Sequence, residues 1–283
     1  MEFETLASGF GLLEGPRVDE RNRLYFADVP RGGVYRRDLN GTIETLIAGR
    51  KGVGGILFNQ GGGLVVSGRT LALWDERTGA IRDLFASYND KRLNGLNDMT
   101  VDDGGSVYVG SLEFNALSDE KPVPGFLYRI DPDGTITRLW EGIELTNGLA
   151  FSADRKLLYH CDSTTKAIWV YDVAPDRTVR DRRVFARIPD GWPDGMAVDI
   201  EGGIWVAAVF AGEVVRFKRD GTLDRRVQIP AKKVTSLVFG GGDLQDLYVV
   251  TADNADDASR QGTIFRTRSD IPGLAVPKAR FAV

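Results

Sequence analysis

The chain has 283 residues, of which 42% are hydrophobic and 27% are charged, and its formal net charge is −4. This composition is ordinary for a globular protein and lacks the basic excess of a nucleic-acid-binding protein. No apolar run approaches the roughly 18 residues of a membrane-spanning helix, so we expect neither a nucleic-acid nor a membrane partner. The N-terminus is acidic where a signal peptide would be basic, and the expected location is cytoplasmic.

One pattern returns six times along the chain. It consists of a polar or small residue, an apolar stretch, a turn, and a second apolar stretch that is often aromatic. The copies span residues 14–28, 54–67, 97–111, 147–162, 194–208 and 236–251. Internal repeats of this kind indicate a fold built of equivalent units. Because they fill the chain from end to end, they predict one domain over residues 1–283.

Each copy predicts two short strands joined by a tight turn. The turns are rich in glycine, aspartate and asparagine, which supply the positive φ angles of hairpins, as at 102–105. Two further strands follow in each unit, and Asp133-Gly134 and Asp220-Gly221 mark the hairpins between them. The units begin 40 to 50 residues apart, which is the length of a four-stranded propeller blade.

The predicted fold is therefore all-β, a six-bladed β-propeller with four antiparallel strands per blade. The sixth unit lacks a fourth strand of its own. Residues 3–16 line up with fourth strands that lead into a following blade, so the N-terminus can close the ring. The C-terminal residues 276–283 offer a competing closure, and the sequence leaves both open.

Four polar residues occupy the same position of the repeat, at the entrance to the first strand of a blade. They are Glu14, Asn97, Asn147 and Asp194. In a propeller this strand lines the central channel, so the four side chains are expected to converge at one channel mouth. Any one of them alone would ordinarily be a turn or cap residue, but four at one phase predict a central metal site. Carboxylate and amide oxygens suit calcium or magnesium, and also manganese or iron(II).

A histidine-rich zinc centre is excluded. Zinc prefers histidine and cysteine ligands, and the chain has only His160 and Cys161, which are adjacent and on a strand would point to opposite faces. The same separation argues against a Cys-His catalytic pair. A Ser-His-Asp triad would have to use His160, whose strand neighbours indicate packing or hydrogen bonding near the site.

Several short motifs occur in a specific order and spacing. They are the segments 13–16, 24–28, 93–98, 146–152, 159–163, 193–199 and 234–241. On these motifs the chain resembles the SMP-30/gluconolactonase/luciferin-regenerating (LRE)-like family over essentially its full length. The resemblance implies a six-bladed propeller with one catalytic divalent metal at the channel mouth and, in many members, hydrolysis of sugar lactones.

The resemblance also implies roles for individual residues. Glu14, Asn147 and Asp194 look like direct metal ligands, and Asn97 looks like a fourth ligand or a substrate contact. Calcium is the expected ion, and zinc, manganese, magnesium and iron(II) also occur in the family. Further candidates for substrate binding are Arg92, Asn94, Glu113 and Asp162, where Arg92, Asn94 and Asp162 could instead support the site from behind.

The chain departs from the sugar-lactonase pattern in three places. Residues 51–55 of the second unit have no polar side chain near the expected site except Lys51, and residues 252–257 are acidic where several sugar lactonases have an arginine. The loop 112–117 of the third unit carries two large apolar groups beside Glu113 and Asn115. Phe114, Trp192 and Phe210 near the expected rim favour a substrate less polar than an aldonolactone, with packing within a lid as the equal alternative.

The leading hypothesis is hydrolysis of a small-molecule lactone or ester by metal-activated water. Asp194 is the first candidate for general base and Glu14 the second. Alternatives on the same site are hydrolysis of organophosphates or other esters, or another metal-assisted step such as isomerisation of an enolisable substrate. A non-catalytic propeller that serves as a binding module is an alternative of a different class. We expect a monomer or a weak homo-oligomer.

Overall fold

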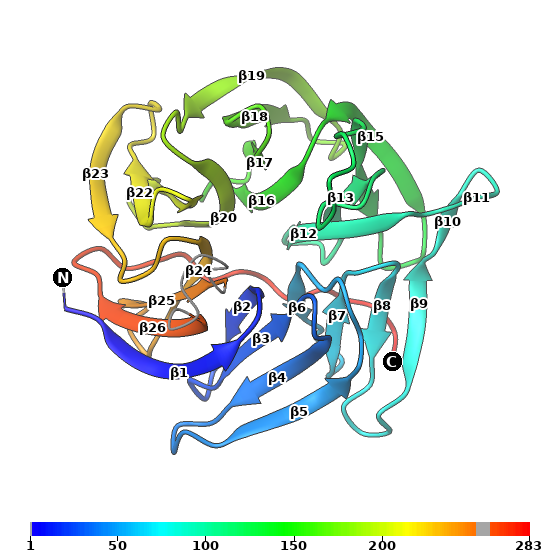
Figure 1. Ribbon diagram of the computed structural model, residues 1–283. Coiled ribbons are helices and arrows are strands. Elements are labelled where there is room, and N and C mark those ends of the chain that lie inside the picture. Colours follow the sequence, from blue (N-terminus) through cyan, green and yellow to red (C-terminus); the bar gives the residue numbers. More distant parts are fainter. Residues whose placement is uncertain (1, 253–260) are drawn as a thin grey trace.

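The computed structural model describes residues 2–252 and 261–283. Six four-stranded antiparallel sheets are arranged as blades around a central channel (Figure 1). The described residues contain strands, turns and irregular segments but no α-helix, and hence no helix that could cross a membrane. The predicted all-β, six-bladed propeller is confirmed.

The strands of each blade follow one another outward from the channel. Blades one to three comprise β2 (Leu13–Val18), β3 (Leu24–Asp28), β4 (Gly33–Arg37) and β5 (Ile43–Ala48); β6 (Ile56–Phe58), β7 (Leu64–Val66), β8 (Leu71–Trp74) and β9 (Ile81–Phe85); and β12 (Gly95–Val101), β13 (Val107–Leu112), β14 (Gly125–Ile130) and β15 (Ile136–Ile143). Blades four to six comprise β16 (Thr146–Phe151), β17 (Leu157–Asp162), β18 (Ala167–Val173) and β19 (Val179–Arg187); β20 (Trp192–Val198), β21 (Ile204–Val209), β22 (Glu213–Phe217) and β23 (Leu223–Gln228); and β24 (Val234–Gly240), β25 (Asp246–Thr251), β26 (Gly262–Arg268) and β1 (Glu4–Phe10). A small hairpin of β10 (Ser87–Tyr88) and β11 (Lys91–Arg92) projects outward between blades two and three (Figure 1).

The N-terminus closes the ring. Strand β1 pairs antiparallel with β26 and supplies the outermost strand of blade six. This confirms the first of the two closures that the sequence left open. The first and last blades are thereby joined by backbone hydrogen bonds, and a sheet edge that would otherwise be exposed is paired.

The C-terminal segment has a different place. Residues 269–283 run across the end of the channel that faces the turns between first and second strands (Figure 1, red). Ala279 N donates to Phe58 O at 2.9 Å, and Arg280 N donates to Gly105 O at 3.2 Å. Phe281 is buried beside blades two and three. The segment therefore covers the channel end opposite to the starts of the inner strands.

Hydrophobic side chains pack between neighbouring blades. Tyr108 of blade three meets Phe151 of blade four edge to face, with ring centroids 4.9 Å apart. Trp205 of blade five meets Phe239 of blade six in the same way at 5.7 Å. Such contacts between aromatic pairs stabilise the ring beyond the area they bury. They fix the six inner strands around one channel.

Candidate metal centre at the channel mouth

The inner strands of five of the six blades are distorted in the same way near their starts. In five blades the pairing of the first two strands shifts by one residue at this point. The shifts lie between Glu14 and Arg17, Leu96 and Met99, Thr146 and Leu149, Pro193 and Met196, and Val234 and Ser236. A β-bulge bends its strand and re-aims the side chains next to it. Glu14, Asn97, Asn147 and Asp194 all stand at these bulges.

A small residue follows three of the four polar residues. An added Cβ at Gly148 would lie 2.5 Å from the Asp194 carbonyl oxygen, and one at Gly15 would lie 3.1 Å from the backbone nitrogen of Ile56. Gly195 packs in the same way against Ser236. Glycine is required at these positions because the backbones of neighbouring inner strands approach closely. The approach draws the bulged positions together at the channel mouth.

The two asparagines are linked across blades three and four. Asn97 Nδ2 donates to Asn147 Oδ1 at 2.6 Å and to the Thr146 carbonyl at 2.7 Å. Asn147 Nδ2 donates to Ser163 Oγ at 2.7 Å, and Ser163 Oγ donates to the Pro193 carbonyl at 2.6 Å. This chain of hydrogen bonds ends one residue before Asp194, so three blades hold their polar residues in a fixed relation.

The carboxylates at the mouth are buried and repel one another. Burial, followed by the charges of Asp194 and Asp98, raises the pKa of Glu14 well above its usual value. Burial and the charge of Asp98 likewise raise the pKa of Asp194. Asp194 Oδ1 is buried and has no hydrogen-bond partner among the described residues. A buried carboxylate oxygen without a partner costs free energy unless a ligand or water satisfies it.

The sequence interpretation missed two charged residues of this cluster. Asp98 is buried, accepts a hydrogen bond from Met99 N at 2.7 Å, and has its pKa raised to about 6 by burial. Arg17 reaches from blade one to blade three, where Nη2 donates to the Met99 carbonyl at 3.3 Å. Its positive charge acts on Asp98 and opposes the rise of that pKa.

The residues present fit a hard divalent cation. Three ionised carboxylates and one guanidinium leave two negative charges unmatched, which one divalent cation would balance. The orphaned Asp194 oxygen supplies a free donor atom. Among the described residues, no three His, Cys, Asp or Glu side chains are gathered as a ready ligand cluster, so the predicted set depends on its amide oxygens.

Asn97 also explains why the second blade is bare at this position. An added Cβ at Gly54 would overlap Asn97 Oδ1, and one at Gly55 would lie 2.8 Å from Met99 Cγ. The side chain of blade three therefore occupies the space that a polar residue of blade two would need. In this arrangement Asn97 donates to Asn147 and turns its own oxygen toward Gly54.

The predicted substrate residues fall into two groups. Asn94 Nδ2 donates to the Glu113 carbonyl at 3.1 Å, and the Glu113 carboxylate accepts from Ser111 and lies 3.7 Å from Lys91 Nζ. These residues of blade three are thus gathered. Arg92 is exposed on the outward-projecting β10–β11 hairpin, and no ion pair holds it within the described part of the chain.

Asp162 lies behind the site. Its carboxylate is almost fully buried and accepts hydrogen bonds from the backbone nitrogens of Glu144 and Leu145 at 3.2 and 3.1 Å. It thereby holds the connection that leads into β16, where Asn147 lies. Of the two predicted roles, this geometry favours support over substrate contact.

His160 is a supporting residue as well. Its Nε2 lies 2.6 Å from Thr146 Oγ1, and burial together with the Arg182 charge lowers its pKa to about 3. The imidazole is therefore neutral and packed behind the strand that carries Asn147. No Ser or Cys nucleophile is among the hydrogen-bond partners found for it in the described residues.

The family model described as "SMP-30/Gluconolactonase/LRE-like region" matches residues 12–253. The chain belongs to this family. The gluconolactonase-like assignment is supported by two curated relatives. The pentonolactonase XacC of Haloferax volcanii is 32% identical over 88% of this chain and 84% of its own length. The 6-deoxy-6-sulfogluconolactonase of Pseudomonas putida is 31% identical over 90% and 89%. A solved structure of a luciferin-regenerating enzyme superposes with a TM-score of 0.89 at 27% identity, covering 99% of each chain.

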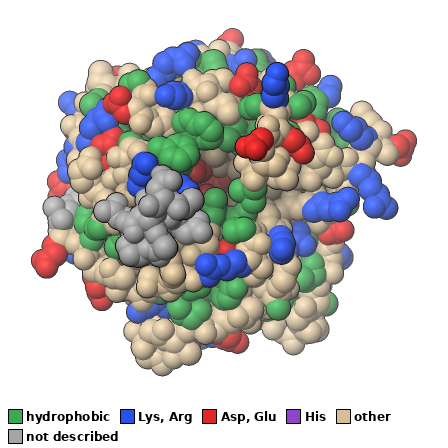
Figure 2. All heavy atoms as spheres, in the orientation of Figure 1, with side chains coloured by type: hydrophobic (Ala, Val, Ile, Leu, Met, Phe, Trp, Pro, Cys, Tyr) green, Lys and Arg blue, Asp and Glu red, His purple; other side chains and the backbone are tan. Residues whose placement is uncertain are grey.

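The rim of this SMP-30/gluconolactonase-like mouth is partly apolar. Figure 2 shows a hollow near the centre of one face, bordered by hydrophobic side chains. Trp192 and Phe210 form an edge-to-face pair, with ring centroids 5.5 Å apart, while Phe114 is half-buried. Of the acidic segment 252–257, residues 253–257 lie outside the described residues.

Proposed function

We propose that the protein is a divalent-metal-dependent lactonase, in which metal-activated water opens a lactone ring. The observation that carries this proposal is the orphaned, buried oxygen of Asp194 beside a second repelling carboxylate, Glu14. Perturbed carboxylates in a concave site mark functional positions. The names of the pentonolactonase and sulfogluconolactonase relatives support a lactone as substrate.

The side chains at the mouth have separate roles in this proposal. Glu14, Asn147 and Asp194 would hold the ion, with calcium the first choice because every donor is oxygen. Asn97 keeps Asn147 oriented through the 2.6 Å hydrogen bond. When bound, a divalent cation polarises the lactone carbonyl and lowers the pKa of a coordinated water.

Asp194 would move the proton. One oxygen of its carboxylate would hold the ion, and the other would accept a proton from the attacking water as the water oxygen bonds to the carbonyl carbon. The ring carbon–oxygen bond then breaks, and the departing ring oxygen takes up a proton to give a hydroxy acid. Glu14 is the alternative base, since it shares the buried cluster. Asn94 and Glu113 lie at the blade-three side, where they would contact the substrate.

A lactone panel with metal-stripped protein tests the proposal. Turnover is followed with a pH indicator after calcium, magnesium, manganese, zinc or iron(II) is restored. We expect turnover to return with one of these ions and to be lost in Asp194→Ala. Asp270→Asn is the matched control, because Asp270 is a carboxylate of the outer surface paired with Arg225 at 2.8 Å.

Two results would contradict the proposal in different ways. Metal binding at Glu14 and Asp194 without hydrolysis of any lactone would favour an ester, organophosphate or isomerisable substrate. A protein whose ligand binding survives Asp194→Ala would favour a binding module.

A further inference from the structure

Two aromatic side chains stand exposed at the mouth. Trp192 begins β20 and is 37% exposed, and Phe210 follows β21 and is 46% exposed. They are the only exposed aromatic residues in the described part of the chain. Their rings pack edge to face at an interplanar angle of 88°. Aromatic side chains usually bury most of their area in cores or interfaces, so this exposure needs a reason.

The backbone at Phe210 is strained. Ala211 N donates to the Ala208 carbonyl at 3.2 Å and closes a turn in which Phe210 is the third residue, with φ of 69°. This turn position normally takes glycine. A bulky side chain there is an outlier, and such strain clusters at binding and catalytic sites. The packing of this half-exposed ring on Trp192 is too small a structural gain to explain a phenylalanine at such a position.

The pair lies next to the proposed reaction centre. Trp192 is two residues before Asp194 on β20, which places their backbones about 7 Å apart along the strand. Trp192 pairs across the sheet with Val209, the neighbour of Phe210. Both rings therefore border the end of the channel at which Asp194 stands.

The mouth has chemically different sides. The blade-three side presents Asn94 and Glu113, whose amide and carboxylate suit hydroxyl groups. Blade five presents two aromatic rings at the rim, Trp192 from the start of β20 and Phe210 from the turn after β21. A substrate that fits both sides has a polar ring and one apolar substituent.

We propose that Trp192 and Phe210 bind an apolar substituent of the substrate, so that the preferred class is lactones with an alkyl or aryl group. This inference rests on the proposed lactonase activity. The rings act as specificity determinants and take no part in the proton transfer.

Three six-membered lactones form the test with the metal-loaded protein. They are unsubstituted δ-valerolactone, a δ-valerolactone with a hexyl substituent, and glucono-1,5-lactone. We expect the hexyl compound to have the highest kcat/KM. Trp192→Ala and Phe210→Ala should lower its kcat/KM about tenfold, since each buried methylene contributes roughly a factor of four. The unsubstituted ring should change less than about twofold, because its chemistry does not involve the pair.

Phe210→Gly separates binding from folding. Glycine adopts the φ of 69° without strain, so this variant should have a higher Tm than Phe210→Ala. It should nevertheless lose the same preference for the hexyl compound. A purely structural role of the ring would give the opposite pattern, in which activity follows stability.

The outcomes distinguish the two proposals. If the protein hydrolyses glucono-1,5-lactone best, or if the variants lower all three substrates equally, the inference is wrong and the lactonase proposal stands. If no lactone is hydrolysed, the lactonase proposal is wrong. Calorimetry with a hexyl-substituted δ-lactam then decides the inference alone: binding that Trp192→Ala weakens supports it, and binding that is absent or unchanged overturns it.

Discussion

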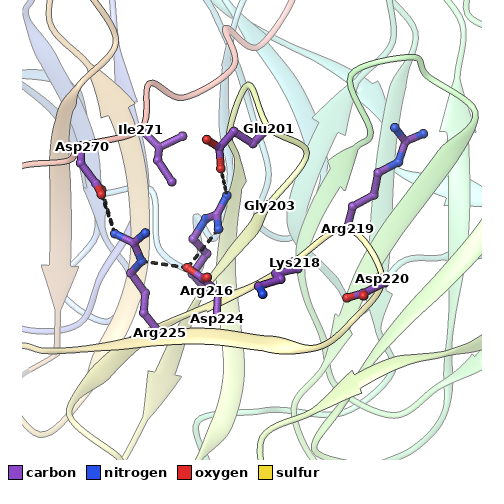
Figure 3. Close-up of a pocket in the computed structure, with 10 residues that line it drawn as sticks. All are labelled: Glu201, Gly203, Arg216, Lys218, Arg219, Asp220, Asp224, Arg225, Asp270 and Ile271. Atoms are coloured by element: carbon purple, nitrogen blue, oxygen red, sulfur yellow. Dashed lines mark hydrogen bonds and ion pairs between the residues drawn. The ribbon is translucent and has the colours of Figure 1, made fainter.

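Two regions of the molecule contain buried acidic side chains, and they differ in how the negative charges are compensated. At the channel mouth Glu14, Asp98 and Asp194 are buried together, and the Arg17 guanidinium acts on Asp98 alone. On the outer part of blade five, Arg216 and Arg225 pair with several carboxylates beside a cavity of about 590 Å³ (Figure 3). Arg216 Nε lies 2.7 Å from Asp199 Oδ2, and its two other nitrogens pair with Glu201 and Asp224 at 2.9 and 3.0 Å.

The pKa values follow this difference. Hydrogen bonds from Arg225 lower the pKa of both Asp224 and Asp270. At the mouth, burial and mutual repulsion raise the pKa of Glu14 and Asp194. The carboxylates of blade five have their charges compensated by arginines and serve the structure. The carboxylates at the mouth are not compensated, and such a cluster is destabilising until a ligand binds to it. The cavity beside blade five is therefore the weaker candidate for a cation. Three of its four lining acids, Glu201, Asp224 and Asp270, already have arginine partners, and the fourth, Asp220, accepts hydrogen bonds from Thr222.

The largest effect is expected from Asp194→Asn. It should lower kcat/KM by about 10³-fold, because it removes both a proposed ligand and the proposed base. The Tm of the metal-free protein should stay level or rise, since a buried, repelled charge disappears. Lactone kinetics together with thermal unfolding in a chelator measure both. Retained activity with a Tm several degrees lower would show that Asp194 is a structural residue.

Arg216→Met makes the converse change in blade five. It leaves the fully buried Asp199 without its ion-pair partner, which costs about 3–5 kcal/mol of unfolding free energy. The kcat/KM of the folded fraction should remain within about twofold of wild type. The double variant Asp199→Asn Arg216→Met should recover part of the loss in urea unfolding, since both charges are then absent. An Arg216→Met protein as stable as wild type would refute the comparison.

Gly54→Ala tests the packing at the mouth without changing a charge. The new Cβ would overlap Asn97 Oδ1 and displace the side chain that orients Asn147. We expect metal affinity to fall about 10- to 100-fold, as for other residues that position ligands, measured by calorimetric titration. Gly242→Ala is the matched control, because no heavy atom lies within 4 Å of its added Cβ and its φ is not left-handed. Equal affinities in the two variants would argue against a positioning role for Asn97.

The repeat made it possible to predict the closed ring and the equivalent positions of the four polar residues in it. Hydrophobic alternation and turn residues recur with each blade, so equivalent positions in the sequence become equivalent positions in space. The bulges at Glu14, Asn97, Asn147 and Asp194 were not predictable, because an extra residue in one strand of a pair is defined only by its partner strand.

Asp98 and Arg17 could have been found by comparing equivalent positions of the six repeat copies. The residue after the polar position is glycine in four of the six copies, but it is Asp98 in the third. Three residues after the polar position, Arg17 is the only charged residue of the six. The placement of Arg92 could not have been found in this way, because the β10–β11 hairpin is an insertion outside the repeat. The C-terminal segment also lies outside the repeat and lacks strand periodicity. Its contacts with turns of several blades form only when the ring is closed, so they could not be predicted either.

The smallest effect is a difference in pH dependence between the two regions. The raised pKa values of Glu14, Asp98 and Asp194 mean that the metal-free native protein holds more protons than the unfolded chain above about pH 4. Its unfolding free energy should therefore fall as the pH rises from ~5 to ~8, by about 1–3 kcal/mol. The lowered pKa values in blade five act in the opposite direction and only below about pH 4, where their stabilisation is lost.

Urea unfolding in a chelator at several pH values measures this slope. Asp194→Asn should flatten it and Asp270→Asn should leave it unchanged, because only the first belongs to the repelling cluster. Saturating calcium should reverse the slope, since the ion competes with protons for the same oxygens. A chelated protein whose stability rises with pH across this range would mean that the carboxylates at the mouth are already matched, and that the two regions do not differ.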